Sequence, residues 1–381
     1  MRAKWEGGTL DGAARTRGTA PSRARHTALL FCAALAISTV KAAPTRAAEA
    51  SGADRLAAAA TAPERGPSEP AAITAVDSIA VTVGDLDRSV EFYSQVLEFR
   101  QDSDRELLGE GYERLFGLFG VRLRVARLRL GDERLELMEF LTPRGRRVPP
   151  DLHSNDRAFQ HVAIVVSDMR AAYARLRSFR VQHASGAPQR LPDSNPNAGG
   201  IEAFYFRDPD GHYLELLAFP PDKGAAKWHA ESGRLFLGID HTAIVVSDTD
   251  ASLRFYRDVL GLRIAGTSEN FGIEQERLNS VFGAHLRITS LRAAQGPGIE
   301  LLEYLAPRSG RAAPADTVPD DLWYWQINLR AEDPTGLEHR LRGARAPLVS
   351  SQVTHLDEGT LGFTDGVIVR DPDGHASLIE R

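Results

Sequence analysis

The chain has 381 residues, of which 25% are charged, and a formal net charge of −5 at pH 7. At about 150 residues per domain, this length predicts two or three domains, each able to bury a sizeable core. The charge balance gives no basic footprint of the kind that binds nucleic acid, and no acidic tail. Composition therefore indicates an ordinary globular protein and excludes nucleic acid as the expected partner.

Residues 1–50 are predicted to form a secretory signal peptide. Two arginines precede the apolar run 27–40, and small residues follow it. The run is shorter than the ~20 residues that span a bilayer as a helix, so a stable membrane anchor is disfavoured. We expect an exported protein, periplasmic or secreted, cleaved near Ala47 or Ala50. The alternative is a long extension that arises from an upstream start codon.

The next segment, residues 51–72, is rich in Ala, Pro, Gly and charge and is predicted to be a disordered linker. The single cysteine, Cys32, lies early in the apolar run rather than at its end, so we discount lipidation. After cleavage the chain would contain no cysteine, which excludes disulfides, thiolate nucleophiles and cysteine metal ligands.

The remainder of the chain is a duplicated unit. The segment VDSIAVTVGDLDRSVEFYSQVLEFR at 76–100 matches IDHTAIVVSDTDASLRFYRDVLGLR at 239–263, an offset of 163 residues (239 − 76). The motif RDPDGH occurs at 207–212 and again at 370–375 with the same offset. The Pro and Gly positions of DPDG suit a type I turn between strands.

Each copy divides again into two modules, because FQHVAIVVSDMRAAYARL and YWQINLRAEDPTGLEHRL begin like the openings of the copies. The four modules start near Ser78, His161, His241 and Gln326. Each begins with a short apolar strand, then an Asp at the predicted N-cap, then a helix. The predicted N-cap residues are Asp85, Asp168, Asp248 and Asp333.

Hydrophobic periodicity separates two kinds of face. In the first helix Leu86, Val90, Tyr93 and Leu97 recur at helical spacing and predict a face that packs on a sheet. Later segments alternate with period two, which predicts strands with one face toward the helices and one toward a cavity. The predicted cavity-facing residues are Glu136, Met138, Phe140, Tyr213, Glu215, Leu217, Glu300, Leu302 and Tyr304.

This order of strand, Asp, helix, IELLEYL and RDPDGHYLEL resembles the glyoxalase, bleomycin-resistance and extradiol-dioxygenase superfamily, also called the vicinal-oxygen-chelate superfamily. The resemblance spans roughly residues 73–381. It implies an α+β fold in which four βαβββ modules form two paired domains. We place the first domain at 73–220 and the second at 236–381, with a linker at 221–235.

Metal-dependent members of this superfamily carry one ligand at the start of each module's first strand and one near the end of its last strand. The matching positions here are, module by module, Ser78 and Glu136, His161 and Glu215, His241 and Glu300, and Gln326 and Leu378. The outer modules have lost ligands, because Ser78 and Leu378 are poor or impossible donors and Gln326 is a weak one.

Fused relatives pair module two with three and module one with four. With that pairing, His161, Glu215, His241 and Glu300 would hold one divalent ion, either Zn, Ni, Co, Mn or Fe(II), and the outer modules would form a dead or purely binding site. Glu215 and Glu300 are the candidate catalytic carboxylates that move a proton. The conventional pairing, one with two and three with four, would split this set. The linker is long enough for either pairing. Each histidine could also simply hydrogen-bond to a neighbouring backbone group.

Other residues are candidate substrate contacts. Arginines follow the fourth strands of modules one and three and could bind an anion, although a solvated loop is the plainer interpretation. Trp323 and Trp325 could stack on a flat ligand in the degenerate pocket of the outer modules or pack in a core. His212 and His375 are interpreted as turn residues rather than ligands. The arginines are Arg144, Arg146, Arg147, Arg308 and Arg311.

The resemblance implies a divalent-metal-dependent enzyme that transfers a proton on a small substrate with adjacent oxygens, as an isomerase, epimerase or lyase. We expect a monomer or homodimer with a small-molecule partner. Export weakens lactoylglutathione lyase and methylmalonyl-CoA epimerase activities, whose substrates are cytoplasmic. The alternative is a metal-free binding or antibiotic-resistance protein. An extradiol-type dioxygenase is disfavoured, because neither conventional pair of modules, one with two or three with four, holds two histidines and one carboxylate.

Overall fold

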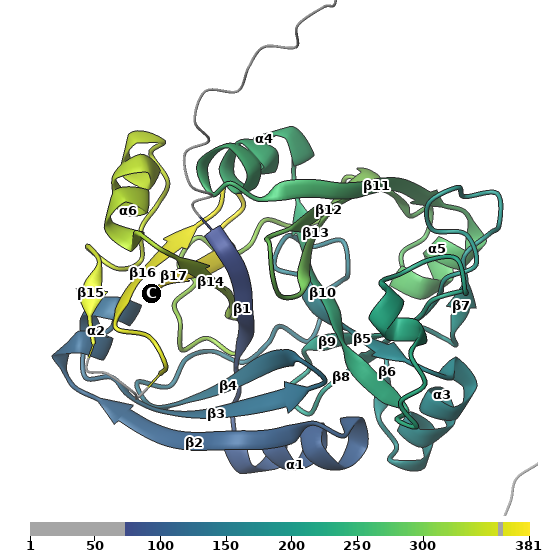
Figure 1. The fold of residues 1–381 in the computed structure, drawn as a ribbon, viewed down its shortest axis with the longest axis horizontal. Coiled ribbons are helices and arrows are strands. Elements are labelled where there is room, and N and C mark those ends of the chain that lie inside the picture. Colours follow the sequence, from purple (N-terminus) through teal and green to yellow (C-terminus); the bar gives the residue numbers. More distant parts are fainter. Residues whose placement is uncertain (1–72, 357–360) are drawn as a thin grey trace, which may run out of the picture. The chain divides into compact units, whose positions relative to one another are not determined.

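A computed structural model describes residues 73–356 and 361–381. They form two curved mixed sheets with short helices against them (Figure 1). The signal peptide and linker predicted for residues 1–72 lie outside the described residues. Among the residues that are described, no helix is long and apolar enough to cross a membrane.

The first sheet combines modules one and four, and we call it the outer-module sheet. Its strand order is β15-β16-β17-β14-β1-β4-β3-β2. The strands are β1 (Ile73–Thr82), β2 (Arg100–Leu108), β3 (Arg122–Leu130), β4 (Glu133–Thr142), β14 (Trp325–Ala331), β15 (Thr354–His355), β16 (Asp365–Arg370) and β17 (Ala376–Glu380). Figure 1 shows this pairing by colour, because the purple and blue strands of module one lie beside the yellow strands of module four.

The second sheet combines modules two and three, and we call it the inner-module sheet. Its order is β11-β12-β13-β10-β5-β9-β8-β6, with β7 also paired to β8. The strands are β5 (Gln160–Val166), β6 (Gln182–His183), β7 (Gln189–Arg190), β8 (Glu202–Arg207), β9 (Tyr213–Ala218), β10 (Phe236–Val246), β11 (Arg263–Phe271), β12 (His285–Arg292) and β13 (Gly298–Ala306).

The sheets therefore pair modules in the order one with four and two with three. Strand β1 lies antiparallel to β14, and β5 lies antiparallel to β10. Each half of the duplicated sequence, 73–220 and 236–381, contributes one module to each sheet. This pairing is the one on which the predicted quartet of metal ligands depends.

The helices begin where the sequence predicts. The side chains of Asp85, Asp168, Asp248 and Asp333 each accept a hydrogen bond from a backbone N–H in the first turn of the helix that follows. The helix of module three changes to a wider π-helical winding after its first turn, which the sequence did not predict. The helices are α1 (Leu86–Leu97), α2 (Glu110–Phe116), α3 (Met169–Ser178), η1 (Ala226–His229), α4 (Thr249–Leu253), η2 (Arg254–Val259), α5 (Ile273–Asn279) and α6 (Pro334–Gly343).

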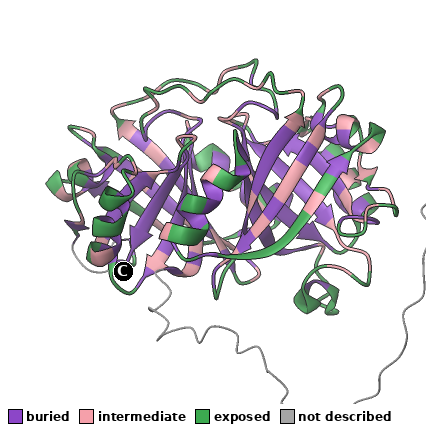
Figure 2. Cartoon of the chain, turned by 90° about the horizontal axis from the view of Figure 1, so that it is seen from above, coloured by how far each residue is buried: buried purple, intermediate pink, exposed green. Residues whose placement is uncertain are grey.

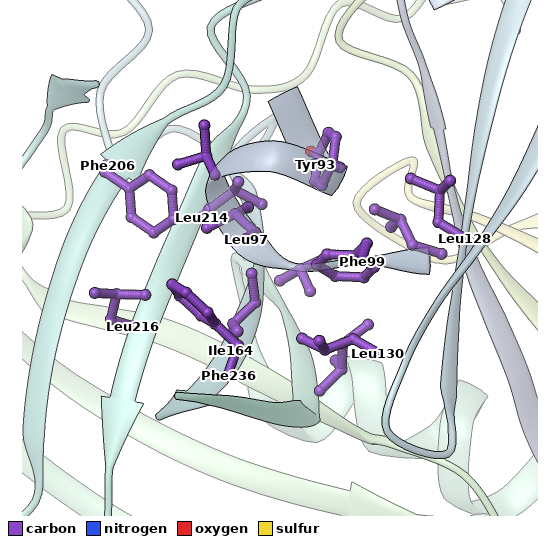
Figure 3. Packing of buried hydrophobic residues seen from close by; sticks show 14 of the residues in the cluster. Tyr93, Leu97, Phe99, Leu128, Leu130, Ile164, Phe206, Leu214, Leu216 and Phe236 are labelled. Carbon is purple, nitrogen blue, oxygen red and sulfur yellow. The ribbon is translucent and has the colours of Figure 1, made fainter. Parts of the chain in front are cut away.

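Buried apolar residues form two cores between helices and strands and two on the opposite faces of the sheets. Consecutive modules share the helical cores: modules one and two share the first, and modules three and four share the second. Figure 3 shows Tyr93 and Leu97 of α1 packed between Leu128 of β3 and Phe206 and Leu214 of the inner-module sheet. Helix packing thus joins modules one with two and three with four, whereas sheet pairing joins one with four and two with three.

The predicted alternation of faces is confirmed. Leu135 and Leu137 lie in the helical core, whereas Met138 and Phe140 lie in the core on the other face of the outer-module sheet. Figure 2 shows buried residues along most strands and exposed residues on helices and loops, and the edge strands β2 and β11 are mostly exposed. Residues whose backbone positions face away from the helices are therefore the ones available to build a site.

Candidate metal centre

The four predicted ligands lie on the four central strands of the inner-module sheet. In the strand register His161 on β5 is opposite Ala243 on β10, which is itself beside Glu300 on β13. Ala163 is opposite His241 and beside Glu215 on β9. Both alanines are small and buried, so the side chains around them can converge on one point.

The side-chain atoms do converge. Nε2 of His161 lies 3.1 Å from Oε2 of Glu215, and Nε2 of His241 lies 3.6 Å from the same oxygen. Oε2 of Glu300 lies 3.4 Å from Nε2 of His241. The ligand atoms of His161, Glu215 and His241 all lie within 4.8 Å of one another, so these three residues form the compact part of the site and Glu300 lies on the His241 side.

No hydrogen bond explains the burial of His161, although its Nε2 lies beside the Glu215 carboxylate. Its residue is 1% exposed, and neither ring nitrogen makes a hydrogen bond within residues 73–356 and 361–381. The rings of Phe159 and Tyr205 lie around it, with centroids at 5.6 and 5.0 Å. A buried imidazole without a hydrogen bond costs free energy, and a metal ion beside Nε2 would give that nitrogen a partner.

The Nδ1 side of the His241 ring is bound by a carboxylate. Its Nδ1–H donates to Oδ2 of Asp240 at 3.0 Å, and Asp240 accepts two further hydrogen bonds from Arg292 at 3.0 Å each. The indole N–H of Trp228 donates to Oδ1 of Asp240 at 3.1 Å. This arrangement fixes the tautomer of His241 so that Nε2 faces the site, as in the carboxylate–histidine pairs that orient metal ligands.

The electrostatics of the site favour a cation. Burial lowers the pKa of His241, but Glu300, Asp240 and Glu215 outweigh it and raise the pKa to about 9. Burial also opposes ionisation of Asp240, but hydrogen bonds and charge from His241 and Arg292 hold its pKa below the ordinary range. Without an ion, a proton on His241 therefore supplies the positive charge that the carboxylates require.

The geometry and donors fit a divalent metal ion. Two ligand atoms at about 2.1 Å from one ion and at right angles lie about 3.0 Å apart, close to the 3.1 to 3.6 Å separations found here. Imidazole and carboxylate donors suit Zn, Ni, Co, Mn or Fe(II). His161, Glu215 and His241 would hold the ion, with Glu300 as a fourth ligand or as a free carboxylate beside it.

A cavity of about 520 Å³ opens beside these residues. Its walls come from the concave face of the inner-module sheet, from α5, and from the loop between β7 and β8. This loop is fixed across the cavity, because Asn195 and Asn197 donate side-chain hydrogen bonds to Asn270 and Thr267 of β11. The volume is in the usual range for small-molecule sites.

The equivalent positions of the outer-module sheet form a closed hydrogen-bond chain. Tyr324 donates to Gln326, Gln326 donates to Asn328, and Asn328 donates to Ser78 at 2.8 to 2.9 Å. Ser78 then donates to Glu136 at 3.2 Å. Apolar side chains that include Leu378 fill the surrounding face. The predicted dead site is therefore packed with side chains of the chain itself.

The predicted substrate contacts lie away from the 520 Å³ cavity. Arg144 lies 3.5 Å from Glu139 in an ion pair, and Arg308 donates to the carbonyl of Leu305. Trp325 is buried in the first helical core. Trp323 packs under the Arg146 guanidinium, 4.6 Å from the ring centroid. Their positions give no support to a role in substrate binding at this site.

Two of the predicted anion-binding arginines have internal partners. Arg146 donates to Asp321, and Arg311 donates to Asp156. Each pair joins the end of one module to the start of a later or earlier one, and both carboxylates are buried. These two arginines therefore stabilise the packing of modules. The interpretation that they bind an anionic substrate is wrong for them.

The histidines after the DPDG turns are structural, as predicted. Nδ1 of His212 pairs with Asp208 at 2.8 Å, and His375 pairs with Asp371 at 2.9 Å. Nε2 of His375 also contacts the carbonyl of Arg157 at 2.8 Å. Each turn closes with a hydrogen bond from the glycine N–H to the first Asp carbonyl, and the glycines have φ of 97° and 98°, which favours glycine there.

Sequence reasoning missed the residues behind His241. Asp240 directly precedes the ligand, but neighbouring strand residues ordinarily face opposite sides, so the pattern gave no reason to join them. Trp228 lies in the segment 221–235 that was predicted to be only a linker, yet it is 8% exposed and contacts Asp240. An acidic residue next to a predicted metal-binding histidine was the available signal.

Comparisons with known proteins agree with this fold. The family model described as Glyoxalase/Bleomycin resistance protein/Dioxygenase superfamily matches residues 75–216 and 238–377. A 2-epi-5-epi-valiolone epimerase from Actinomyces is 35% identical over 150 residues, which cover 38% of this chain and 80% of the relative. A lactoylglutathione lyase from Arabidopsis thaliana is 24% identical over 186 residues, covering 49% of this chain and 54% of the relative.

Solved structures show the same arrangement. Glyoxalase I from Zea mays superimposes with a TM-score of 0.52 at 15% identity, covering 81% of this chain and 92% of that one. A putative dioxygenase from Bacillus subtilis gives a TM-score of 0.51 at 16% identity, covering 81% of this chain and 85% of the other. At such identities the likeness shows the fold alone.

Proposed function

Because the chain belongs to the glyoxalase/bleomycin resistance protein/dioxygenase superfamily, we propose that it is a metal-dependent enzyme that transfers a proton at the carbon next to a carbonyl group. The reaction class is isomerase, epimerase or lyase. The observation that carries the proposal is the meeting of His161, Glu215, His241 and Glu300 beside one cavity. Relatives named as an epimerase and as lactoylglutathione lyases support this class.

Three of these residues would bind the metal ion, and the fourth would exchange a proton with the substrate. His161, Glu215 and His241 would hold a divalent ion, which when bound would act as a Lewis acid toward a substrate carbonyl and acidify the adjacent C–H. Glu300 is the residue that takes up and returns the proton. Its side chain is 21% exposed, lines the cavity, and is oriented by the Ser290 hydroxyl, which donates to Oε1 at 2.6 Å.

The candidate metal ligands lie at the buried end of the cavity, and Glu300 is the more exposed carboxylate. Tyr205 and Leu302 are buried and line the cavity next to the carboxylates. Glu215 is 5% exposed, so it is well placed as a fixed ligand, whereas the more exposed Glu300 can reach a bound substrate. Burial also strengthens the electrostatic effect of each charged group.

The test is exchange of carbon-bound hydrogen in D₂O. Protein reconstituted with Zn, Ni or Mn is incubated with 2-keto-myo-inositol, and deuterium at the carbon beside the carbonyl is followed by NMR. We expect exchange with wild type and a loss of at least about 100-fold in Glu300→Gln, with the metal retained. Glu136→Gln, at the equivalent position of the outer-module sheet, is the matched control and should exchange normally. Exchange that persists in Glu300→Gln would contradict the role of Glu300.

A ring-cleaving dioxygenase is the second candidate. The sequence disfavoured it because neither conventional pair of modules, one with two or three with four, supplies two histidines and one carboxylate. The fold supplies that set from modules two and three, as His161, His241 and Glu215, so this reason no longer holds. An iron-dependent extradiol dioxygenase from Rhodococcus jostii is 31% identical over 106 residues, 32% of that protein. Oxygen uptake with catechol and Fe(II), insensitive to Glu300→Gln, would favour this candidate.

A further inference from the structure

The wall of the cavity combines apolar and polar side chains, and its polar part is almost uncharged away from the candidate ligands. Apart from those ligands and Asp240, its polar lining consists of amide and hydroxyl side chains, and no Lys or Arg lines it within the described part of the chain. The amide and hydroxyl residues are Asn197, Tyr205, Thr267, Ser268, Asn270, Gln275 and Ser290. Such groups form hydrogen bonds with hydroxyl and carbonyl groups of a ligand.

The charges around the cavity would cancel once one divalent ion is bound. Asp240 is neutralised by its two hydrogen bonds with the Arg292 guanidinium, so it offers no free charge to a ligand. The carboxylates of Glu215 and Glu300 carry two negative charges, which one divalent ion would balance. An anionic group that entered this cavity would lose hydration without gaining an oppositely charged partner, which is unfavourable.

Gln275 provides an unsatisfied acceptor in the same wall. It is 2% exposed, it lines the cavity, and its carbonyl Oε1 has no hydrogen-bond partner among the described residues. Its amide N–H₂ donates to Oδ1 of Asn279, and Asn279 in turn donates to the Tyr304 hydroxyl at 2.6 Å. These bonds fix which end of the Gln275 amide is left without a partner, namely the acceptor.

We propose that this site selects an uncharged, polyhydroxylated carbonyl compound, and that a hydroxyl group of that compound donates to Oε1 of Gln275. This inference rests on the proposed function for the identity of the reacting carbonyl group. It excludes substrates whose recognition needs a cation, such as glutathione conjugates with their free carboxylates, coenzyme A esters and sugar phosphates. Gln275 is thus a specificity-determining residue on α5, separate from the ligands on the sheet.

The experiment compares two six-membered polyhydroxy ketones that differ in charge. Binding of 2-keto-myo-inositol, which is neutral, and of 3-dehydroquinate, which carries a carboxylate, is measured by titration calorimetry on the full chain loaded with Zn. We expect the neutral ketone to bind at least tenfold more tightly to wild type. Gln275→Met should weaken its binding about tenfold, whereas Arg277→Gln, on the exposed side of the same helix, should leave it unchanged.

A second variant tests the charge argument by gain of function. Ser268→Arg places a cation in the lining of the cavity and should reverse or abolish the preference for the neutral ketone. The inference is overturned if wild type binds 3-dehydroquinate as tightly as the neutral ketone, or if Gln275→Met binds the neutral ketone normally. Proton exchange is a separate readout: exchange of 3-dehydroquinate would keep the proposed function and sink this inference, whereas selective binding without exchange would do the opposite.

Discussion

Asp240 and His241 are consecutive residues of β10, yet the carboxylate of one accepts a hydrogen bond of 3.0 Å from the Nδ1–H of the other. Adjacent residues of a regular strand point to opposite faces. The pairing of β10 with β5 shifts register between Ile239 and His241, and this irregularity lets both side chains lie beside the cavity. A local departure from strand geometry therefore gives the candidate metal ligand its own support.

Loss of this support should weaken metal binding without unfolding the protein. Asp240→Asn removes the charge that orients His241, so we expect a 10- to 100-fold loss of affinity for Zn or Ni, measured by competition with a chelator. Asp77 occupies the equivalent position in the first copy (240 − 163), where it contacts Arg134 and Arg330. Asp77→Asn is the control and should retain wild-type affinity; an equal loss in both variants would argue against a specific role for Asp240.

Metal content should depend on the inner-module sheet alone. The described domains, purified without chelator, should hold about one divalent ion per chain, and the double variant His161→Ala/His241→Ala should hold none. Ser78→Ala/Gln326→Ala, at the corresponding strand starts of the outer-module sheet, should keep the ion, because both residues hydrogen-bond to Asn328 within that sheet. Plasma emission spectrometry gives the content. A wild-type protein that takes up no Zn, Ni, Mn or Fe(II) would instead favour a metal-free binding protein.

Metal binding should release a proton near neutral pH. In the ion-free protein the pKa of His241 is raised to about 9, and a metal requires the neutral imidazole. Affinity should therefore fall about tenfold for each pH unit below 9, with about one proton released per ion at pH 7 and almost none above about pH 10.5. Calorimetry in buffers of different ionisation enthalpy measures this number. Metal affinity that is flat between pH 7 and 9 would contradict a protonated His241.

The raised pKa of His241 also makes the stability of the ion-free fold depend on pH. The folded pKa of about 9 exceeds the value of about 6.5 expected in the unfolded chain. Protonated His241 thus stabilises the ion-free fold fully below pH 6.5, and this contribution disappears as pH rises through 9. Urea unfolding of ion-free protein at pH 6 and pH 9.5 should show the loss, and the loss should be smaller in Asp240→Asn.

The outer-module sheet should respond to substitution through stability only. Asn328→Leu removes hydrogen bonds to Gln326, Ser78 and Glu136 and leaves buried polar groups without partners, which we expect to cost about 1–3 kcal/mol of unfolding free energy. Urea unfolding measures the cost, and metal content and proton exchange should stay at wild-type values. A changed metal content would mean that the two sheets are functionally coupled.

Much of the fold follows from local patterns in the sequence. The N-cap aspartates, the helix faces and the alternation that places Met138 and Phe140 away from Leu135 all depend on spacings of 2 or 3.6 residues, and the structure confirms them. The residue types His161, Glu215, His241 and Glu300 were also identifiable, because the repeat aligns them with positions that carry ligands in the resembled superfamily.

Tertiary structure alone decided which modules meet. The linker after residue 220 allows either pairing, and the choice depends on which strands join edge to edge across more than 70 residues of sequence, as β5 does with β10. It also decided that Arg146 and Arg311 bind Asp321 and Asp156. These outcomes are sums of many weak non-local contacts, which no spacing along the chain encodes, whereas periodicity encodes only what a strand or helix presents to its immediate neighbours.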